Sequence, residues 1–317
     1  MSYICKTPVV MIIFNRPQFT RKVFDEIRKV KPAKLYVISD GSRDNNSDDI
    51  SNVEICREIV NEVDWTCDVI RIYSDSNLGC KKRVISGLNE VFSKEERAII
   101  LEDDCVPTEA FFEFCDWGLD RYENNNQVAI VSGSNLLDYV SDLALNEGDR
   151  AGFSMYINCW GWATWKRTWN EFDPYLSVQE INSKRIFLFK NTTLGKTERL
   201  FWTNVFKHSV STRTIWDFYL QYTFFENSFV SIYPKYNLVR NIGFGNDSTH
   251  TFNIPKFVEH SLPNVTKFAE IMRLHEPESI IVNDARDKQV IRIVYGYSKL
   301  ATIKLVLGNN LRYNGII

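Results

Sequence analysis

Short apolar runs alternate with amphipathic stretches along the first 135 residues of the chain. The runs are rich in Val, Ile and Leu, which is typical of strands buried on both faces of a sheet. The stretches between them carry apolar residues at helical spacing, as do Val23, Ile27 and Val30 after Pro17. The predicted strands are Val9 to Phe14, Leu35 to Ser39, Val69 to Tyr73, Ala98 to Leu101 and Val128 to Gly133. The first predicted helix starts at Pro17, and the other three cover Ser51 to Val63, Lys81 to Phe92 and Thr108 to Tyr122.

This alternation predicts βαβ units and an α/β fold with a three-layer, Rossmann-type, mostly parallel sheet. From about residue 136 to about residue 255, longer aromatic-rich connections replace the alternation, and Asp284 to Ile317 has the pattern of one amphipathic helix. We therefore expect one domain over residues 1–255, divided into halves at residue 135, and a C-terminal helical extension over residues 256–317.

The charge balance excludes one class of function. The chain of 317 residues has 38 Lys and Arg against 40 Asp and Glu, with a pI of about 6.2. A protein that coats duplex nucleic acid carries a strong positive charge, so we expect no nucleic-acid partner. Aromatic residues make up 14% of the chain, with four of the eight Trp between Trp160 and Trp169.

The cysteines and the N-terminal residues bear on the compartment. The seven Cys form no C-x-x-C pair, and no apolar run approaches the ~20 residues of a membrane span. The N-terminal residues lack the charged region and the long apolar core of a signal peptide. These features predict a cytoplasmic protein.

Three consecutive acidic residues, Glu102, Asp103 and Asp104, directly follow the fourth predicted strand. Ligands bind to parallel sheets beyond the carboxyl ends of the strands, which is where these carboxylates are expected. Oxygen ligands suit Mg²⁺ or Mn²⁺, and such cations complete their coordination with water and substrate phosphates. The alternative is a solvated acidic turn that caps the next helix.

Three other predicted strands end in polar residues at the same sheet edge. Arg16 follows the first strand, and its guanidinium suits a base edge or a phosphate. Asp40 follows the second strand and can accept hydrogen bonds from a nucleobase or a ribose hydroxyl, although Asp-Gly is also a common turn. Lys81 to Arg83 open a helix, where cations are unfavourable unless an anion faces them. Together these groups predict a site for a nucleoside diphosphate and its metal.

The segments FNRP, SDGSRD, NLGCKKR and ILEDDCVP resemble the donor half of a GT-A glycosyltransferase. They are similar to the N-acetylglucosaminyltransferases that initiate complex N-glycans and to related bacterial proteins, in which E-D-D replaces D-x-D. The resemblance covers about the first 135 residues well and the next hundred loosely. It implies that Asp104 ligates the metal, and that Glu102 and Asp103 contact the ribose or donor sugar. It also implies nucleotide contacts for Arg16, Asp40 and Arg83, and we include Lys81 in the donor site.

The resemblance places a catalytic base in the second half, where the family has a W-D-D-W type motif. Here Asp217 follows Trp216, but Phe218 occupies the position of the family's base. Asp217 is the candidate general base, and a carboxylate that starts a helix is the alternative. The family's late glycine-serine-histidine element resembles the loop that ends in His250, the second candidate metal ligand.

The aromatic segment YINCWGWATWKRTW carries the remaining site prediction. Indole faces stack on sugars, and Trp160 and Trp162 resemble the aromatic acceptor loops of GT-A enzymes, so we assign them to the acceptor. Trp165 and Trp169, four residues apart, are expected to pack in the core.

The sequence as a whole predicts a metal-dependent, inverting glycosyltransferase that moves a sugar from a nucleotide-sugar donor, UDP-linked by the resemblance, to a glycan or lipid-linked acceptor. A sugar-nucleotide nucleotidyltransferase would share the fold and the metal. A non-catalytic glycan-binding protein could use the Trp cluster but has no need of the acidic triplet.

The C-terminal segment allows two interpretations. Its cations alternate with apolar residues, and they are Arg286, Lys288, Arg292, Lys299 and Lys304. Such a helix either packs on the domain, which we prefer, or lies on the inner face of an anionic membrane close to a lipid-linked acceptor.

Overall fold

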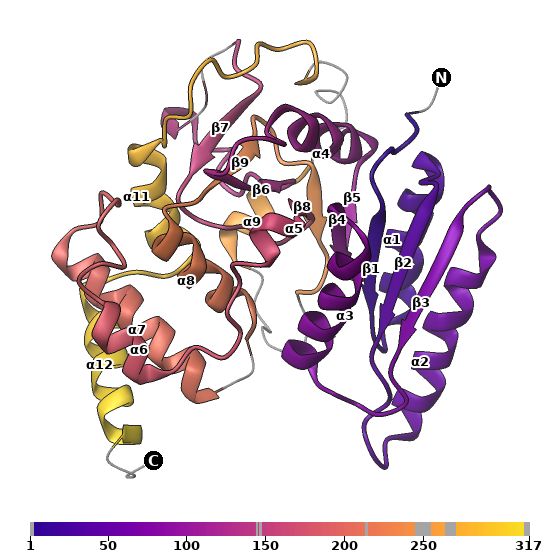
Figure 1. Cartoon of the computed structure of the whole chain (residues 1–317), viewed down its shortest axis with the longest axis horizontal. Coiled ribbons are helices and arrows are strands. Elements are labelled where there is room, and N and C mark those ends of the chain that lie inside the picture. Colours follow the sequence, from indigo (N-terminus) through magenta and orange to yellow (C-terminus); the bar gives the residue numbers. More distant parts are fainter. Residues whose placement is uncertain are drawn as a thin grey trace.

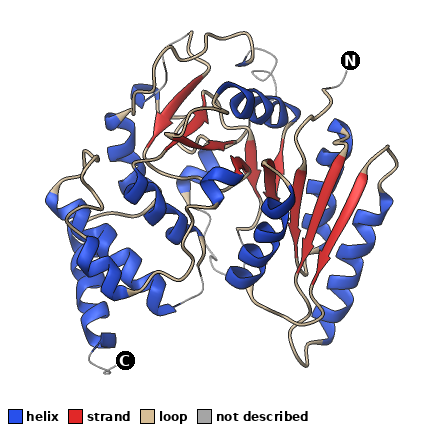
Figure 2. Cartoon of the chain, viewed as in Figure 1, coloured by secondary structure: helices blue, strands red, loops and turns tan. Residues whose placement is uncertain are grey.

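The computed structural model of the protein describes residues 3–143, 145, 148–212, 215–244, 255–263 and 271–313. A central sheet of eight strands carries helices on both faces (Figures 1 and 2). The strands are β1 (Val9–Ile13), β2 (Lys34–Ser39), β3 (Asp68–Tyr73), β4 (Arg97–Glu102), β5 (Cys105–Pro107), β6 (Val128–Ser132), β7 (Ala151–Ser154), β8 (Trp162–Trp165), β9 (Val230–Pro234) and β10 (Val239–Asn241). The helices are α1 (Pro17–Val30), α2 (Ser47–Ile59), α3 (Cys80–Lys94), α4 (Glu109–Arg121), α5 (Lys166–Trp169), α6 (Val178–Lys184), α7 (Lys196–Thr212), α8 (Asp217–Asn227), α9 (Lys256–His260), α11 (Asp284–Ile293) and α12 (Lys299–Tyr313).

The strand order in the sheet is β3-β2-β1-β4-β8-β6-β9-β7, and β5 pairs with β10 in a separate ribbon. Strands β1, β2, β3 and β4 pair in parallel, as do β6 and β9. Strand β8 lies antiparallel between β4 and β6, and β7 is antiparallel to β9. The predicted α/β class and mostly parallel sheet are therefore confirmed.

Alternate side chains of β1, β2 and β4 enter two separate apolar cores. Val9 and Met11 of β1 pack with α1, α2 and α4 on one face, whereas Val10 and Ile12 pack with α3 on the other. Burial on both faces explains why these strands appear as continuous apolar runs in the sequence. The alternation confirms the three layers, which place α3 opposite α1 and α2 across the sheet (Figure 1).

Helices α6, α7, α8 and α12 form a separate helical region beside the second half of the sheet (Figures 1 and 2). Aromatic rings fill its interior, where Trp202 stacks on Tyr156 and Phe206 at centroid distances of 5.7 and 5.4 Å. Trp165 and Trp169 are also buried, as expected, although Trp165 ends strand β8 and only Trp169 belongs to a helix.

The C-terminal segment is two helices, so the single helix predicted for Asp284 to Ile317 is wrong within the part that the structure describes. Helix α11 ends at Ile293, and Gly296 takes a left-handed φ of 68° before α12 begins. Val282, just before α11, bridges Phe153 of β7, so the chain returns to the sheet there. Among the described residues, no helix combines the length and the apolar character needed to cross a membrane.

Candidate functional site

A cavity of about 390 Å³ opens where β1, β2 and β4 end. Its volume falls within the range of ~300–1,000 Å³ that is usual for ligand pockets. The side chains predicted for the donor site come together here, because parallel strands bring their carboxyl ends to one edge. The predicted residues that line the cavity are Arg16, Asp40, Arg83, Glu102, Asp103 and Asp104. Further lining residues, which were not among the predicted site residues, include Arg43, Asn77, Asn241, Gly243 and Phe244.

Arg16 bridges two acids of the triplet. Its guanidinium forms an ion pair with Asp103 and lies 3.1 Å from a carboxylate oxygen of Asp104. Burial raises the pKa of Asp103 to about 6, against the opposing influence of Arg16. The guanidinium of Arg16 thus neutralises part of the negative charge at the strand ends. A second cation bound there would neutralise more of it.

Asp40 holds the loop in front of α3. Its buried carboxylate accepts hydrogen bonds from the backbone N–H groups of Gly41, Leu78 and Gly79 at 3.0, 2.9 and 3.0 Å. An added Cβ at Gly41 would lie 2.6 Å from the backbone carbon of Ser76, so only glycine fits at this point. Asp40 lines the cavity but also fixes its wall.

The two cations predicted on α3 take different positions. Arg83 is buried, lines the cavity and donates to the carbonyl oxygen of Ile72 at 3.1 Å, and its burial lowers the pKa of the guanidinium. Lys81 is not among the cavity-lining residues, because its ammonium lies over the ring of Tyr219, 3.4 Å from the centroid. The structure therefore does not bring Lys81 to the wall of this cavity.

Asp104 faces the cavity with a side chain that is 16% exposed. Gly243 lies against it so closely that an added Cβ would be 2.3 Å from its Oδ2 atom. Among the described residues, no group of three or more His, Cys, Asp or Glu side chains could hold a metal. One or two carboxylates on a cavity wall fit a hard cation that also binds substrate phosphates. The other candidate ligand, His250, lies outside the described residues.

A second, smaller cavity of about 160 Å³ adjoins the first, since Glu102 and Trp160 line both. Asp217, the first residue of α8, lines the smaller cavity, and one of its buried oxygens has no partner in the described part of the chain. Burial raises the pKa of Asp217 to about 6. Burial and the charges of Asp104, Asp103 and Asp217 raise the pKa of Glu102 to about 8.

The two tryptophans assigned to an acceptor differ in exposure. Trp160 is half-buried between the cavities, where its ring packs beside Phe244 and Phe257 at 5.5 and 6.2 Å. Trp162 is 1% exposed, belongs to strand β8 and stacks on Trp216 at 5.8 Å. The acceptor contact expected for Trp162 is inconsistent with this burial, and its ring supports the residue before Asp217 instead.

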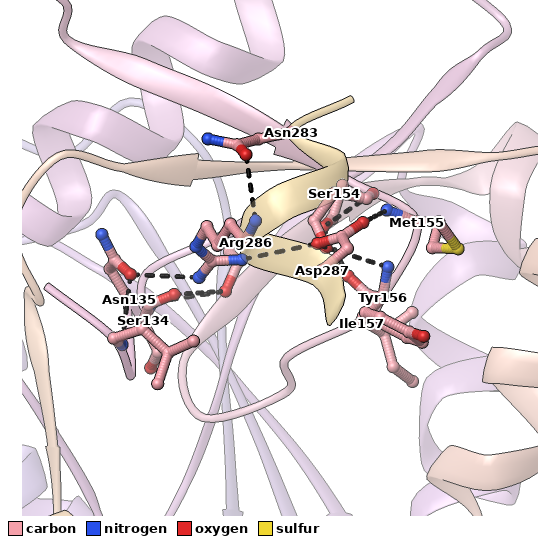
Figure 3. A network of polar contacts seen from close by, with 12 residues as sticks. Ser134, Asn135, Ser154, Met155, Tyr156, Ile157, Asn283, Arg286 and Asp287 are labelled. Carbon is pink, nitrogen blue, oxygen red and sulfur yellow. Dashed lines mark hydrogen bonds and ion pairs between the residues drawn. The ribbon is translucent and has the colours of Figure 1, made fainter. Parts of the chain in front are cut away.

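The floor of the smaller cavity includes Arg286, a residue that the sequence pattern placed among surface cations. Arg286 is 5% exposed, its guanidinium covers the ring of Tyr233 at 3.7 Å, and it donates to the side-chain oxygen of Asn135 at 3.0 Å. Its neighbour Asp287 accepts hydrogen bonds from the Ser154 hydroxyl at 2.6 Å and from a backbone N–H (Figure 3). This network joins the C-terminal segment to the cavity. The sequence did not indicate it, because Arg286 fits the amphipathic pattern of the segment as well as the exposed cations do.

Neither a protein family model nor a curated protein matches the chain. Among solved structures, the chain is similar to the mannosyltransferase PcManGT from Pyrobaculum calidifontis in complex with GDP-Man and Mn²⁺, with a TM-score of 0.36 and 14% identity over 52% of this chain and 46% of that one. It is also similar to the inositol-1-phosphate CTP transferase from T. maritima, with a TM-score of 0.40 and 9% identity over 88% of this chain and 100% of that one. A UDP-glucose pyrophosphorylase complexed with UDP-glucose has a TM-score of 0.24 at 8% identity, over 47% of this chain and 62% of its own. The chain thus spans less than half the length of the mannosyltransferase.

Proposed function

We propose that the protein is a metal-dependent, inverting glycosyltransferase. It would move a sugar from a nucleotide-sugar donor, UDP-linked by the resemblance, to a hydroxyl of a glycan or lipid-linked acceptor. The observation that carries this proposal is the junction of the two cavities at Glu102 and Trp160. A transferase needs a space for its donor and a smaller space beside it in which a sugar ring meets a base, and the two cavities match that need.

The larger cavity is assigned to the nucleoside diphosphate. Arg16 and Arg83 supply positive charge along its wall, and Asp40 keeps the loop of Leu78 and Gly79 in place for the nucleotide. Asp104 would hold Mn²⁺ or Mg²⁺ together with the donor phosphates. When bound, the cation neutralises the charge that develops on the departing diphosphate.

The smaller cavity is assigned to the reacting sugar and the acceptor hydroxyl. In the proposed step, Asp217 accepts the hydroxyl proton while the acceptor oxygen bonds to the anomeric carbon from the face opposite the diphosphate. The bond from that carbon to the diphosphate oxygen breaks, and its electron pair leaves with the nucleotide. A carboxyl with a pKa of about 6 is ionised at neutral pH and is still basic enough to take the proton. Trp160 offers an aromatic face to the sugar at the junction.

A thermal-shift panel tests the proposal. The protein is heated with UDP, GDP, CDP or TDP, each with and without Mn²⁺, and the Asp104→Ala variant is treated in the same way. The proposal predicts that one diphosphate raises the melting temperature of the wild type only when Mn²⁺ is present. Absence of metal-dependent stabilisation by all four would overturn it. A glycan-binding protein would instead bind glycans equally well with and without Asp104.

A further inference from the structure

Helix α12 packs on the protein with one face. Thr302 is 2% exposed and Asn309 is 5% exposed, and the side-chain amide of Asn309 donates to the backbone and side-chain oxygens of Asn204 on α7 at 2.9 and 3.1 Å. Ala301 and Leu305 pack against the apolar core that contains the aromatic rings of the helical region. The expected packing of this segment on the domain is therefore confirmed for α12.

The opposite face of α12 carries an exposed apolar stripe. Its residues are Leu300, Ile303, Leu307 and Leu311, with exposed fractions of 62, 55, 57 and 40%. Spacings of three, four and four residues place these side chains in one row along a helix. Folding normally leaves such residues singly on a surface, whereas a continuous row marks an interaction site. The helix lies at the outer edge of the helical region (Figure 1), and the stripe is on the side opposite Thr302 and Asn309, the buried residues of the packed face.

The charged residues of the C-terminal segment have one sign from Lys288 onward. From Lys288 to the C-terminus the sequence contains no Asp or Glu, and its cations are Lys288, Arg292, Lys299, Lys304 and Arg312. Lys299 and Lys304 are exposed on α12 itself. Arg286, which the sequence pattern grouped with them, is buried in the cavity floor and belongs to a different part of the protein.

We propose that α12 docks on an anionic lipid surface, with the stripe in the boundary between headgroups and acyl chains. An apolar row flanked by cations is the pattern of helices that lie in a membrane interface. Lys299 and Lys304 would meet lipid phosphates, which attract cations close to the surface. A second copy of α12 would bring the same cations together, so charge complementarity favours the lipid over self-association.

The position of α12 links this surface to the proposed reaction. Helix α7 packs against both α12 and α8, and α8 begins at Asp217. Docking through α12 would therefore hold the helical region that carries Asp217 next to the membrane, where a lipid-linked acceptor is embedded. The docking itself does not depend on the proposed transfer, since it needs neither donor nor metal.

Vesicle flotation of the full chain tests the docking. One set of vesicles is pure phosphatidylcholine, and the other contains equal parts of phosphatidylcholine and phosphatidylglycerol. The Ile303→Gln/Leu307→Gln variant removes two members of the stripe. Its matched control is Ile50→Gln/Ile55→Gln, which removes two residues that are 60 and 41% exposed on α2. A Lys299→Gln/Lys304→Gln variant removes charge alone.

The wild type and the α2 control are expected to float with the anionic vesicles and not with the neutral ones. The stripe variant should bind at least tenfold more weakly. The lysine variant should bind about 25-fold more weakly, since each cation near an anionic surface contributes roughly fivefold. Circular dichroism melts should be the same for all four proteins, because every changed side chain is exposed.

Three results would overturn the proposal. The first is no binding of the wild type to anionic vesicles, and the second is equal binding of the wild type and the stripe variant. The third is a wild-type dimer in sedimentation equilibrium that becomes a monomer in the stripe variant while no protein floats. That result would make the stripe a contact between copies of the chain.

Discussion

Replacing Asp217 by Asn should separate stability from activity. The wild-type carboxyl has its pKa raised by burial to about 6, from an ordinary value of 3.8. A group whose pKa is raised in the fold favours the folded state while protonated, so this contribution is lost as the pH rises through about 6. The difference corresponds to about 3 kcal/mol, and partial exposure of the residue reduces it to about 1–3 kcal/mol. The side-chain amide of D217N stays neutral, so the variant does not lose this stability as the pH rises.

The expected result is a pH-dependent gain in stability. Urea unfolding should show D217N and the wild type with equal free energies of unfolding near pH 4, and D217N about 1–3 kcal/mol more stable near pH 7. Nucleoside diphosphate binding should be unchanged, because Asp217 lines the smaller cavity and not the larger one. Transfer should fall by about 10²–10⁴-fold, the usual contribution of general base catalysis.

The pH profile of the wild type gives an independent check on the same carboxyl. Activity should rise with pH through about 6 as Asp217 loses its proton. The control is the Asp25→Asn change on α1, which removes a half-exposed carboxyl that lies near Arg21 and Arg28 and lines neither cavity. Full transfer activity in D217N, or stability curves for D217N and the wild type that run parallel across this pH range, would refute the reasoning.

Three further substitutions test the site and its support. Asp104→Asn should abolish the Mn²⁺-dependent part of nucleotide binding and leave metal-independent binding, measured by calorimetry; retained metal dependence would exclude Asp104 as the ligand. Gly243→Ala should weaken nucleotide binding about tenfold in the same assay, because its Cβ would lie 2.3 Å from the Asp104 oxygen and displace that carboxylate, at a cost of about 1–3 kcal/mol. Arg286→Met should lower the free energy of unfolding by about 3–5 kcal/mol, since it leaves Asp287 as an unpaired buried charge, and adding Asp287→Asn should restore part of the loss; an unchanged urea midpoint would show that the pair does not support the cavity.

The sequence predicted the first half of the sheet well because the signals there are local. Strands β1, β2 and β4 are built around continuous apolar runs, β3 keeps a shorter apolar pattern around Arg71, and the helices between them carry their own periodicity. The acids and Arg16 could be brought to one edge without coordinates, since parallel strands end on the same side. Burial of the carboxylates and the hydrogen bonds of Asp40 required the folded chain.

The second half was less predictable because its contacts are distant in sequence. Strand β8 has only four residues and inserts between β4 and β6, so its position depends on partners 30 or more residues away. Trp162 appeared to be a surface aromatic for the same reason, because its place on the central strand β8 and its stacking on Trp216 depend on distant partners. Arg286 was the least predictable of these residues, because its charge suggested a solvated helix face. It lines the smaller cavity because the chain returns to β7 just before α11.

Phosphorus NMR of the reaction products tests the central claim most directly. The protein is incubated with a nucleotide sugar, Mn²⁺ and a mixture of glycan and lipid-linked acceptors, with and without added pyrophosphate, and the new phosphorus species are identified. Glycosyl transfer should give a nucleoside diphosphate as the only new nucleotide, formed only with metal, lost in the Asp104→Ala variant and unaffected by pyrophosphate. A nucleoside triphosphate and a sugar phosphate that form on addition of pyrophosphate would contradict it and assign the site to nucleotidyl transfer.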